Sequence, residues 1–236
     1  MKKFIKKVVK EFLLEINTKP FDIKNFIKKG VKFEKLFYIN VNKKLKRVKN
    51  RRDFLLKLMP NHSICAEIGV YKGKFSIKIL EKVEPKKLHL IDPWKYQEAE
   101  DFQEAAYGGK AGSQEVMNKI YSEMKARLRK EIEKGKVEIH RGFSHLVYKD
   151  FPDKYFDWIY IDGNHQYDYV RKDLKLFFPK VKIGGYITGD DYKEIGWWEG
   201  GVKKAVDEYI KNERVKKIKI KNGQFILQKL EKKYED

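Results

Sequence analysis

The stretch of sequence that decides the fold runs from residue 63 to residue 76 and reads Ser63-Ile-Cys-Ala-Glu67-Ile-Gly69-Val-Tyr-Lys-Gly73-Lys-Phe-Ser76. The apolar run before Gly69 is typical of a short buried strand, and the apolar spacing after Gly73 is typical of a helix. Two glycines between them let the backbone turn tightly and come close to a ligand. The stretch therefore predicts a strand, a ligand-binding turn and a helix of an α/β fold.

Strands and helices alternate outward from this unit. We expect strands at 63–68, 87–91, 137–140, 156–161, 185–188, 215–220 and 224–228. We expect helices at 53–58, after Gly73, near 115–134, at 168–178 and at 202–211. Asn222-Gly223 marks a tight turn between the last two strands. This alternation predicts a Rossmann-like, doubly wound, mostly parallel seven-stranded sheet that ends in an antiparallel hairpin.

The positive charge is concentrated at the start of the chain. The 236 residues include 54 Lys and Arg and 34 Asp and Glu, which gives a formal net charge of +20. Residues 1–52 carry +14 of this charge, so the remainder of the chain is only mildly basic. A protein that follows a nucleic acid usually carries basic clusters across its working face. The distribution argues against nucleic acid as the partner.

Residues 1–51 are predicted to form a basic N-terminal helical extension, and residues 52–236 the main domain. Apolar residues at helical spacing, with lysines between them, predict an amphipathic helix over 2–17. Its apolar face is expected to pack on the main domain or on a second subunit, which would make a homo-oligomer. A peripheral contact with an anionic membrane surface is the alternative.

The composition favours a cytoplasmic protein. Cys65 is the single cysteine, so no intrachain disulfide can form, which suits a reducing compartment. The sequence shows no apolar stretch of the length that a membrane span needs, nor the apolar core of a signal peptide.

The second strand ends in Asp92, 19 residues after Gly73. A carboxylate at that place can accept hydrogen bonds from both ribose hydroxyls of a nucleoside. Tyr71 stands where a pyrophosphate-binding turn has its second glycine, which disfavours an NAD oxidoreductase.

These residues resemble the class I S-adenosylmethionine-dependent methyltransferases, whose first motif reads acidic-x-Gly-x-x-x-Gly. The resemblance implies that Glu67, Gly69 and Gly73 form the turn beside the methionine end of S-adenosylmethionine, and that Asp92 holds its ribose. Ser144, in the turn after the third strand, resembles the residue on the adenine side. A generic Rossmann turn is the plain alternative.

Acidic residues follow two further strands. Asp162-Gly-Asn-His165-Gln-Tyr comes after the strand at 156–161, and Asp190-Asp191 comes after the strand at 185–188. Because the carboxyl ends of neighbouring parallel strands meet at one edge of the sheet, we expect these carboxylates to converge. A cluster of oxygen ligands favours Mg²⁺, Mn²⁺ or Ca²⁺ over zinc.

The ensemble, over roughly residues 52–228, is similar to the sugar and macrolide O-methyltransferases that include macrocin O-methyltransferase, and more distantly to catechol O-methyltransferase. The resemblance implies that Asp162, Asp190 and Asp191 are metal ligands and that His165, beside Asp162, is the catalytic base. A bound metal ion would lower the pKa of an acceptor hydroxyl and fix its position. The alternatives are that one of the paired aspartates caps a turn and that His165 is structural.

We therefore expect an O-methyltransferase that acts on a hydroxyl of a sugar, glycan, glycoside or other small polar metabolite. Two other functions stay open: a nucleic-acid methyltransferase whose basic extension binds phosphate, and a non-catalytic module that senses the cofactor. The polar stretch 94–113 is expected to act as a lid. Trp197-Trp198 is expected either to stack on the acceptor or to anchor the next helix.

Overall fold

A computed structural model of the protein describes residues 51–99, 102–194, 196–212 and 214–231. The helix expected over 2–17 lies outside the described residues, so its structure and its partners stay predictions. A compact unit begins at Arg52. None of the described helices is long and apolar enough to cross a membrane.

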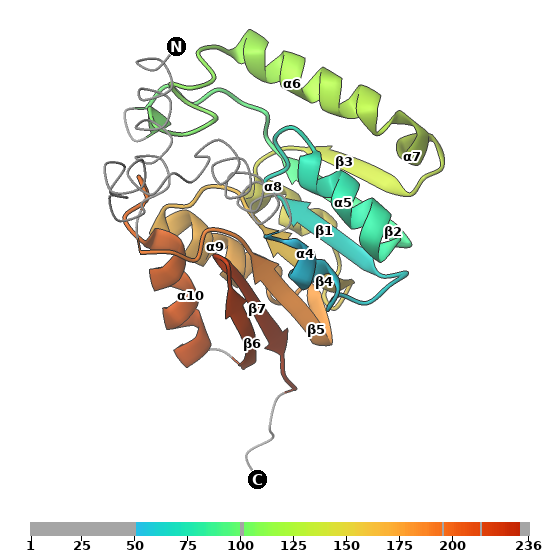
Figure 1. Ribbon diagram of the computed structural model, residues 1–236, viewed down its shortest axis with the longest axis vertical. Helices are drawn as coiled ribbons and strands as arrows, with labels where there is room; N and C mark the ends of the chain where they lie inside the picture. Colours follow the sequence, from blue (N-terminus) through green and yellow to red (C-terminus); the bar gives the residue numbers. More distant parts are fainter. Residues whose placement is uncertain (1–50, 100–101, 195, 213, 232–236) are drawn as a thin grey trace, which may run out of the picture. The chain divides into compact units, whose positions relative to one another are not determined.

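One seven-stranded sheet forms the centre of this unit, in the spatial order β3-β2-β1-β4-β5-β7-β6 (Figure 1). The strands are β1 (Ile64–Ile68), β2 (Lys87–Asp92), β3 (Val137–Arg141), β4 (Phe156–Ile161), β5 (Val181–Gly189), β6 (Val215–Lys221) and β7 (Gln224–Lys229). Strands β1 to β5 run parallel, whereas β7 is antiparallel to both β5 and β6. The predicted Rossmann-like, mostly parallel sheet with its terminal hairpin is confirmed.

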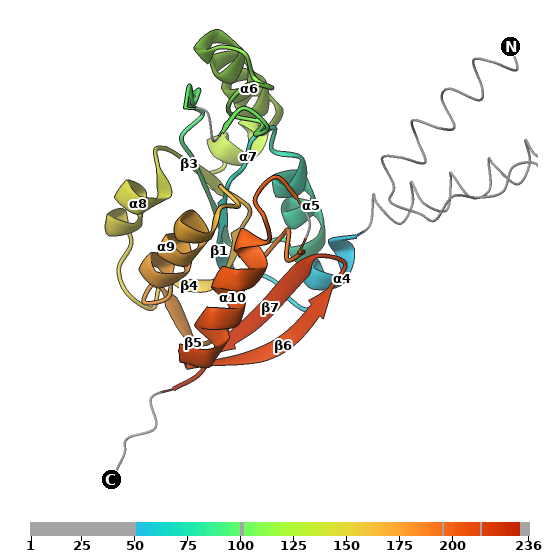
Figure 2. The same cartoon turned by 90° about the vertical axis from the view of Figure 1, so that its left-hand side faces the viewer.

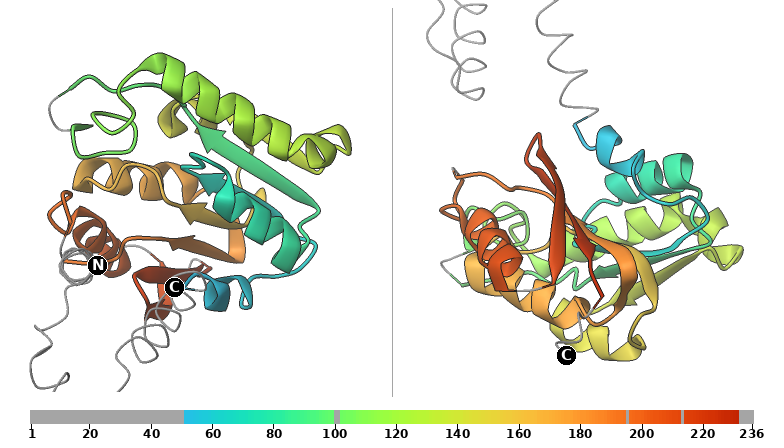
Figure 3. Two further views of the ribbon diagram at one scale, coloured as in Figure 1. Left: turned by 45° about the horizontal axis from the view of Figure 1, so that its top comes forward. Right: turned by 90° about the horizontal axis from the view of Figure 1, so that it is seen from below.

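Helices cover both faces of the sheet (Figures 2 and 3). One layer consists of α4 (Asp53–Leu56), α5 (Lys74–Val83), α6 (Gln114–Arg127) and α7 (Arg129–Glu133). The other layer consists of α8 (Ser144–Val147), the 3₁₀ turn η2 (Tyr148–Asp150), α9 (Tyr167–Phe177) and α10 (Gly201–Asn212). In the right-hand view of Figure 3, α10 lies on one side of β6 and β7, and α4 and α5 lie on the other.

The central strands are apolar on both sides because each face is covered. In β4, Trp158 and Tyr160 pack toward the layer of α4, α5 and α6, whereas Ile159 and Ile161 pack toward α9 and α10. Successive side chains of a strand point to opposite faces, so a strand between two helix layers needs a nearly continuous apolar run. This explains why the run at 156–161 could be identified from the sequence.

The strand order reverses beside β1, because the chain passes from β1 to β2 and β3 on one side and then returns to β4 on the other. Ligands of such sheets bind at the carboxyl ends of the strands, next to this reversal. The loops after β1 and β4 meet there, since the Asp162 amide donates to the Ile68 carbonyl over 2.7 Å.

Three details differ from the expected elements. The helix expected near 115–134 is divided into α6 and α7 at Leu128, whose ψ of 6° leaves the helical range. The short helices α8 and η2 were not expected, because four and three residues are too few to show a periodic pattern. Strand β5 begins at Val181, four residues earlier than expected, and its register with β4 shifts before Tyr186.

Candidate active site

The turn after β1 requires glycine at its first position. Gly69 has a φ of +89°, and a Cβ atom there would lie 2.1 Å from the carbonyl oxygen of Asp162. Gly73 precedes α5 in the left-handed conformation, with a φ of +67°. The turn expected to bind the cofactor therefore lies directly against the loop that follows β4.

Glu67 lies beneath this turn and is fully buried. Its Oε2 accepts a hydrogen bond of 2.5 Å from the Ser76 hydroxyl of α5. Burial raises the pKa of the Glu67 carboxyl to about 8, although the Ser76 hydrogen bond opposes this. Glu67 thus joins the end of β1 to the start of α5, and its contact with the cofactor stays a prediction.

Asp92, the last residue of β2, is buried and accepts hydrogen bonds from its surroundings. Its Oδ2 accepts from the Val70 and Tyr71 amides over 2.8 and 2.9 Å, and its Oδ1 accepts from the Trp94 amide over 2.7 Å. Burial raises the pKa of Asp92. The carboxylate therefore holds the glycine turn against the end of β2.

Tyr107 also donates its hydroxyl to Asp92 Oδ2. This tyrosine belongs to the polar stretch expected as a lid, and its part in the site was not identified from the sequence. A ribose hydroxyl bound at Asp92 would compete with the Tyr107 hydroxyl for the same oxygen. The sequence signal that could have identified Tyr107 is the presence of a tyrosine in the segment that follows β2 and Asp92.

Arg52 is a second residue that sequence reasoning missed. Its guanidinium pairs with Asp162 Oδ2 over 2.9 Å and with Asp190 Oδ2. The same group lies over the rings of Phe75 and Tyr160, 4.9 and 5.4 Å from their centroids. Arg52 therefore supplies positive charge to the carboxylates at the ends of β4 and β5. It stands in the most basic part of the sequence, where no pattern distinguishes it from its neighbours.

Both carboxylate oxygens of Asp190 are engaged by neighbouring groups. Its side chain is fully buried, and Oδ1 accepts from the Asp191 amide over 2.8 Å and from the Gln224 side chain. Its other oxygen pairs with Arg52. The structure thus places Asp190 with a cation and an amide, and its role as a metal ligand stays a prediction.

The structure instead brings Asp162, His165 and Asp191 together, with one potential ligand atom of each within 4.8 Å of the others. His165 Nε2 lies 3.4 Å from Asp162 Oδ1 and 3.6 Å from Asp191 Oδ2. We call these three residues the strand-end group. Asp191 has a φ of +54° and also pairs with Lys193 over 2.7 Å.

The ring nitrogens of His165 are buried; Nε2 makes the two ion-pair contacts with Asp162 and Asp191, and Nδ1 has no hydrogen-bond partner among the described residues. Burial alone would lower the pKa of its imidazole, but the carboxylates of Asp162 and Asp191 raise that pKa above its usual value. The start of α10 packs on the backbone of this loop, since a Cβ at Gly201 would lie 2.7 Å from the His165 carbonyl. The loop thus holds an imidazole whose Nδ1 is available to a ligand.

Two tryptophans lie beside His165. The ring centroids of Trp198 and Trp197 are 5.0 and 6.2 Å from that of the imidazole. The indole nitrogen of Trp198 is buried and, like His165 Nδ1, makes no hydrogen bond within the described chain. A buried donor without a partner is costly, so this corner of the site suits a polar ligand.

Ser144 lies in α8 and points into the protein. Its hydroxyl donates to Asp173 Oδ1 of α9 over 2.5 Å. Asp173 is buried, which raises the pKa of its carboxyl to about 6. The side chain of Ser144 thus fixes α8 to α9, and its place on the adenine side stays a prediction.

Comparison with known families identifies the chemistry of the domain. A family model described as a methyltransferase domain matches residues 66–192. This range begins within β1, includes the glycine turn and Asp92, and ends just after Asp191.

Solved structures show the same fold at low sequence identity. The O-methyltransferase NovP is 22% identical with a TM-score of 0.51, and the alignment covers 79% of this chain and 80% of that chain. A "putative caffeoyl-CoA O-methyltransferase" from Staphylococcus aureus is 17% identical with a TM-score of 0.50, covering 94% and 91%. A "putative rRNA-methylase" from Clostridium thermocellum is 11% identical with a TM-score of 0.54, covering 79% and 97%.

One curated protein matches over a short segment. The uncharacterized protein R132 of Acanthamoeba polyphaga mimivirus is 46% identical over 41 residues. The match spans 17% of this chain and 19% of the length of that relative.

Proposed function

Because the chain belongs to the family of methyltransferase domains, we propose that it transfers the methyl group of S-adenosylmethionine to a hydroxyl of a sugar, glycoside or other small polar metabolite. The observation that carries the proposal is the strand-end group, in which His165 Nε2 lies 3.4 Å from Asp162 and 3.6 Å from Asp191, while Nδ1 has no hydrogen-bond partner among the described residues. Asp162, the first residue of this group, lies against Gly69 of the glycine turn.

The glycine turn and the strand-end group lie close together, which supports transfer of a methyl group from a cofactor at the turn to an acceptor at the strand ends. The backbone of Gly69 touches that of Asp162, so a cofactor held by the turn lies next to the carboxylates. Asp92, which accepts from the amides on the other side of the turn, would offer its carboxylate to the ribose. The methionine end of the cofactor would then be directed toward the end of β4, where the acceptor must bind.

His165 is the proposed base. In the reaction the acceptor oxygen bonds to the methyl carbon while the bond from that carbon to sulfur breaks, which leaves S-adenosylhomocysteine. The hydroxyl proton passes to an imidazole nitrogen of His165, and Asp162 stabilises the resulting positive charge from 3.4 Å. Trp197 and Trp198 would form the wall against which the acceptor packs.

The carboxylates also suit a divalent cation. We propose that Asp162 and Asp191 hold Mg²⁺ or Mn²⁺, with Ca²⁺ as the less reactive substitute, and that Asp190 adds negative charge from the buried side while it stays paired with Arg52. Such an ion supplies Lewis acidity, which lowers the pKa of the acceptor hydroxyl. Arg52 occupies the space between Asp162 and Asp190, so an ion on the Asp191 side of Asp162 leaves that ion pair intact.

Methylation of a nucleic acid is the competing function. It is favoured by the fold shared with the rRNA-methylase structure and by the charge of +14 on residues 1–52. The distribution of that charge argues against it, because the part of the chain that carries the carboxylates is only mildly basic. Binding of single-stranded or duplex RNA that weakens steeply with salt would favour this alternative.

Calorimetric titration of the full chain with S-adenosylmethionine, with and without Mg²⁺, tests the proposal. Asp162→Asn/Asp191→Asn is the test variant, and Asp153→Asn, at an exposed carboxylate paired with Lys180, is the matched control. We expect cofactor binding in all three proteins and Mg²⁺ binding only in the wild type and the control. Absence of cofactor binding in the wild type would overturn the proposed function. Cofactor binding without Mg²⁺ binding would overturn the metal and leave His165 to act alone.

A further inference from the structure

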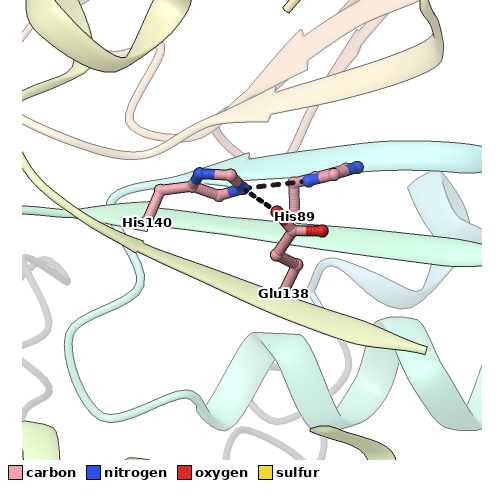
Figure 4. Close-up of side chains that lie close together, drawn as sticks. All are labelled: His89, Glu138 and His140. Atoms are coloured by element: carbon pink, nitrogen blue, oxygen red, sulfur yellow. Dashed lines mark hydrogen bonds and ion pairs between the residues drawn. The ribbon is translucent and has the colours of Figure 1, made fainter. Parts of the chain in front are cut away.

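A second group of potential metal ligands lies away from the strand ends, on the sheet face covered by α8 and η2. His89 comes from the middle of β2, and Glu138 and His140 come from β3 (Figure 4). Figure 4 shows the three side chains directed toward one another. We call them the mid-strand group. We propose that the mid-strand group binds a transition-metal ion of the zinc class through His89 Nδ1, His140 Nε2 and a carboxylate oxygen of Glu138.

The register of the two strands places the three residues together. His89 is the direct partner of Glu138 in the parallel β2–β3 ladder. His140 is two residues beyond Glu138, so both side chains leave β3 on the same face. The positions of the ligands are therefore fixed by backbone hydrogen bonds rather than by a loop.

The distances suit a small ion. His89 Nδ1 and His140 Nε2 are 3.0 Å apart, and His140 Nε2 is 3.7 Å from Glu138 Oε1. One potential ligand atom of each residue lies within 4.8 Å of the other two. Tetrahedral zinc, with bonds of about 2.1 Å, needs ligand atoms roughly 3.4 Å apart. Small side-chain movements would meet this requirement.

A second contact orients the buried imidazole. His89 Nε2 lies 3.2 Å from the Tyr155 hydroxyl. When this nitrogen carries the proton and donates it to Tyr155, the lone pair of Nδ1 is directed at His140. Ligating histidines are usually held in this way by a hydrogen bond from the other ring nitrogen. Without metal, His140 Nε2 carries the proton that lies between the two facing nitrogens, and binding of the ion at Nε2 requires His140 to hold that proton on Nδ1 instead.

The surroundings keep the imidazoles neutral but leave an entry path. Rings of Phe151, Tyr155 and Phe156 pack around His89, which is 3% exposed. Burial lowers the pKa of His89 to about 4, so its ring is neutral, as metal binding requires. The side chain of Glu138 is 48% exposed, and an ion can therefore enter from that side and keep a water as its fourth ligand.

The ligand types separate this site from the strand-end group. Imidazole suits Zn²⁺, Ni²⁺ and Cu²⁺, whereas carboxylates suit Mg²⁺ and Mn²⁺. Lys87 pairs with Glu138 Oε2 over 2.8 Å and leaves Oε1 for the ion. A site that joins β2 to β3 binds only the folded chain, so its occupation stabilises the sheet against unfolding.

The test uses the metal-stripped full chain and Zn²⁺. Affinity is measured by competition with a chromophoric chelator, and thermal unfolding is followed with and without Zn²⁺. His140→Gln is expected to weaken Zn²⁺ binding by at least about 100-fold and to remove the rise in Tm, because it deletes a ligand. Glu138→Gln changes a side chain that is 48% exposed, and it is expected to weaken binding by about 10-fold or more.

Two controls make the result specific. His62→Asn removes an exposed histidine whose φ of +53° asparagine tolerates, and it should bind Zn²⁺ as the wild type does. Asp162→Asn/Asp191→Asn disables the strand-end group and should also keep the tight Zn²⁺ site. Wild-type affinity in folded His140→Gln would overturn the proposal. So would loss of Zn²⁺ binding in the double aspartate variant.

Discussion

The strand-end group and the mid-strand group contain the same kinds of residue in surroundings that differ in charge. Asp162, His165 and Asp191 lie at the ends of parallel strands, next to the cations Arg52 and Lys193. The mid-strand group lies on the sheet face, where aromatic rings surround its buried histidine. The first environment raises the pKa of its histidine, and the second lowers the pKa of His89 to about 4.

This difference shows that position within the sheet determines what a histidine can do. Strand ends admit loop residues from several elements, so charges of both signs can converge there and carboxylates can lie beside an imidazole. A strand face fixes its side chains by register and lets helices exclude water. The first arrangement suits proton transfer at a charged site, and the second suits a neutral ligand for a metal ion.

The largest effect should come from the strand-end histidine. His165→Gln is expected to lower the kcat for methyl transfer about 100-fold to 10,000-fold, because the acceptor proton loses its base. The dissociation constant of S-adenosylmethionine should stay the same. Radiolabelled methyl transfer to an acceptor found by screening measures the first quantity, and calorimetry measures the second.

His62→Asn is the control for His165→Gln and should keep the wild-type kcat. If His165→Gln kept its kcat but no longer bound Mg²⁺, the imidazole would be a metal ligand and not a base. If His165→Gln retained both its kcat and its Mg²⁺ binding, His165 would be neither the base nor a metal ligand, and the proposed difference between the strand-end group and the mid-strand group would be wrong.

The backbone beneath the strand-end group should be nearly as sensitive. Gly69→Ala places a Cβ atom 2.1 Å from the Asp162 carbonyl, so we expect a loss of about 3 kcal/mol or more in the free energy of unfolding. Gly184→Ala has a similar φ, +78°, but open space, and should cost only about 1 kcal/mol. Urea unfolding measures both, and equal losses would show that backbone strain alone, without the close approach, explains the glycine.

Removal of a cation should separate stability from metal affinity. Arg52→Gln leaves the buried Asp190 without its ion pair, which should cost about 3 kcal/mol at neutral pH. It should also strengthen Mg²⁺ binding by about 10-fold, because the guanidinium no longer repels the ion. Arg129→Gln, in an exposed pair with Glu133, should cost less than about 1 kcal/mol and leave Mg²⁺ affinity unchanged. Weaker Mg²⁺ binding in Arg52→Gln would contradict the expected competition.

The smallest effect concerns a buried carboxyl that has a hydroxyl partner in place of a cation. The pKa of Asp173 is about 6 in the folded chain, against 3.8 for the same carboxyl in an unfolded chain. Between these two pH values the folded state therefore binds more protons than the unfolded state. Stability should therefore be highest below pH 4 for this group and fall by about 2 to 3 kcal/mol as the pH rises to about 6. In Asp173→Asn this contribution should be absent. Unfolding curves at several pH values measure the difference, and parallel curves for the two proteins would refute it.

Most of the fold could be predicted because the apolar runs are long and nearly continuous. The run at 156–161 stands out, since β4 is covered on both faces by helices. The division of the helix at Leu128 could not be predicted, because one residue that leaves the helical range does not alter the apolar spacing. The short α8 and η2 could not be predicted, because four and three residues are too few to show a periodic pattern.

For the site, the sequence identified the acidic strand ends but not their partners. Asp162 and Asp191 could be placed because each follows an apolar strand. The turn of Asp190 toward Gln224 could not, since it depends on β7 pairing beside β5. Arg52 and Tyr107 were missed because their contacts are long-range and no local motif marks them. The mid-strand group was not identified from the sequence, because it depends on the β2–β3 register that pairs His89 with Glu138.

Strand β6 stands at one edge of the sheet, and no further strand of the described chain pairs with it. Its exposed residues are mainly lysines: Lys216, Lys217, Lys219 and Lys221. Solvated ammonium groups along an open edge oppose strand-to-strand aggregation. Two copies of the described domain should therefore not join into a continuous sheet through β6, because each would bring its own row of ammonium groups to the shared edge.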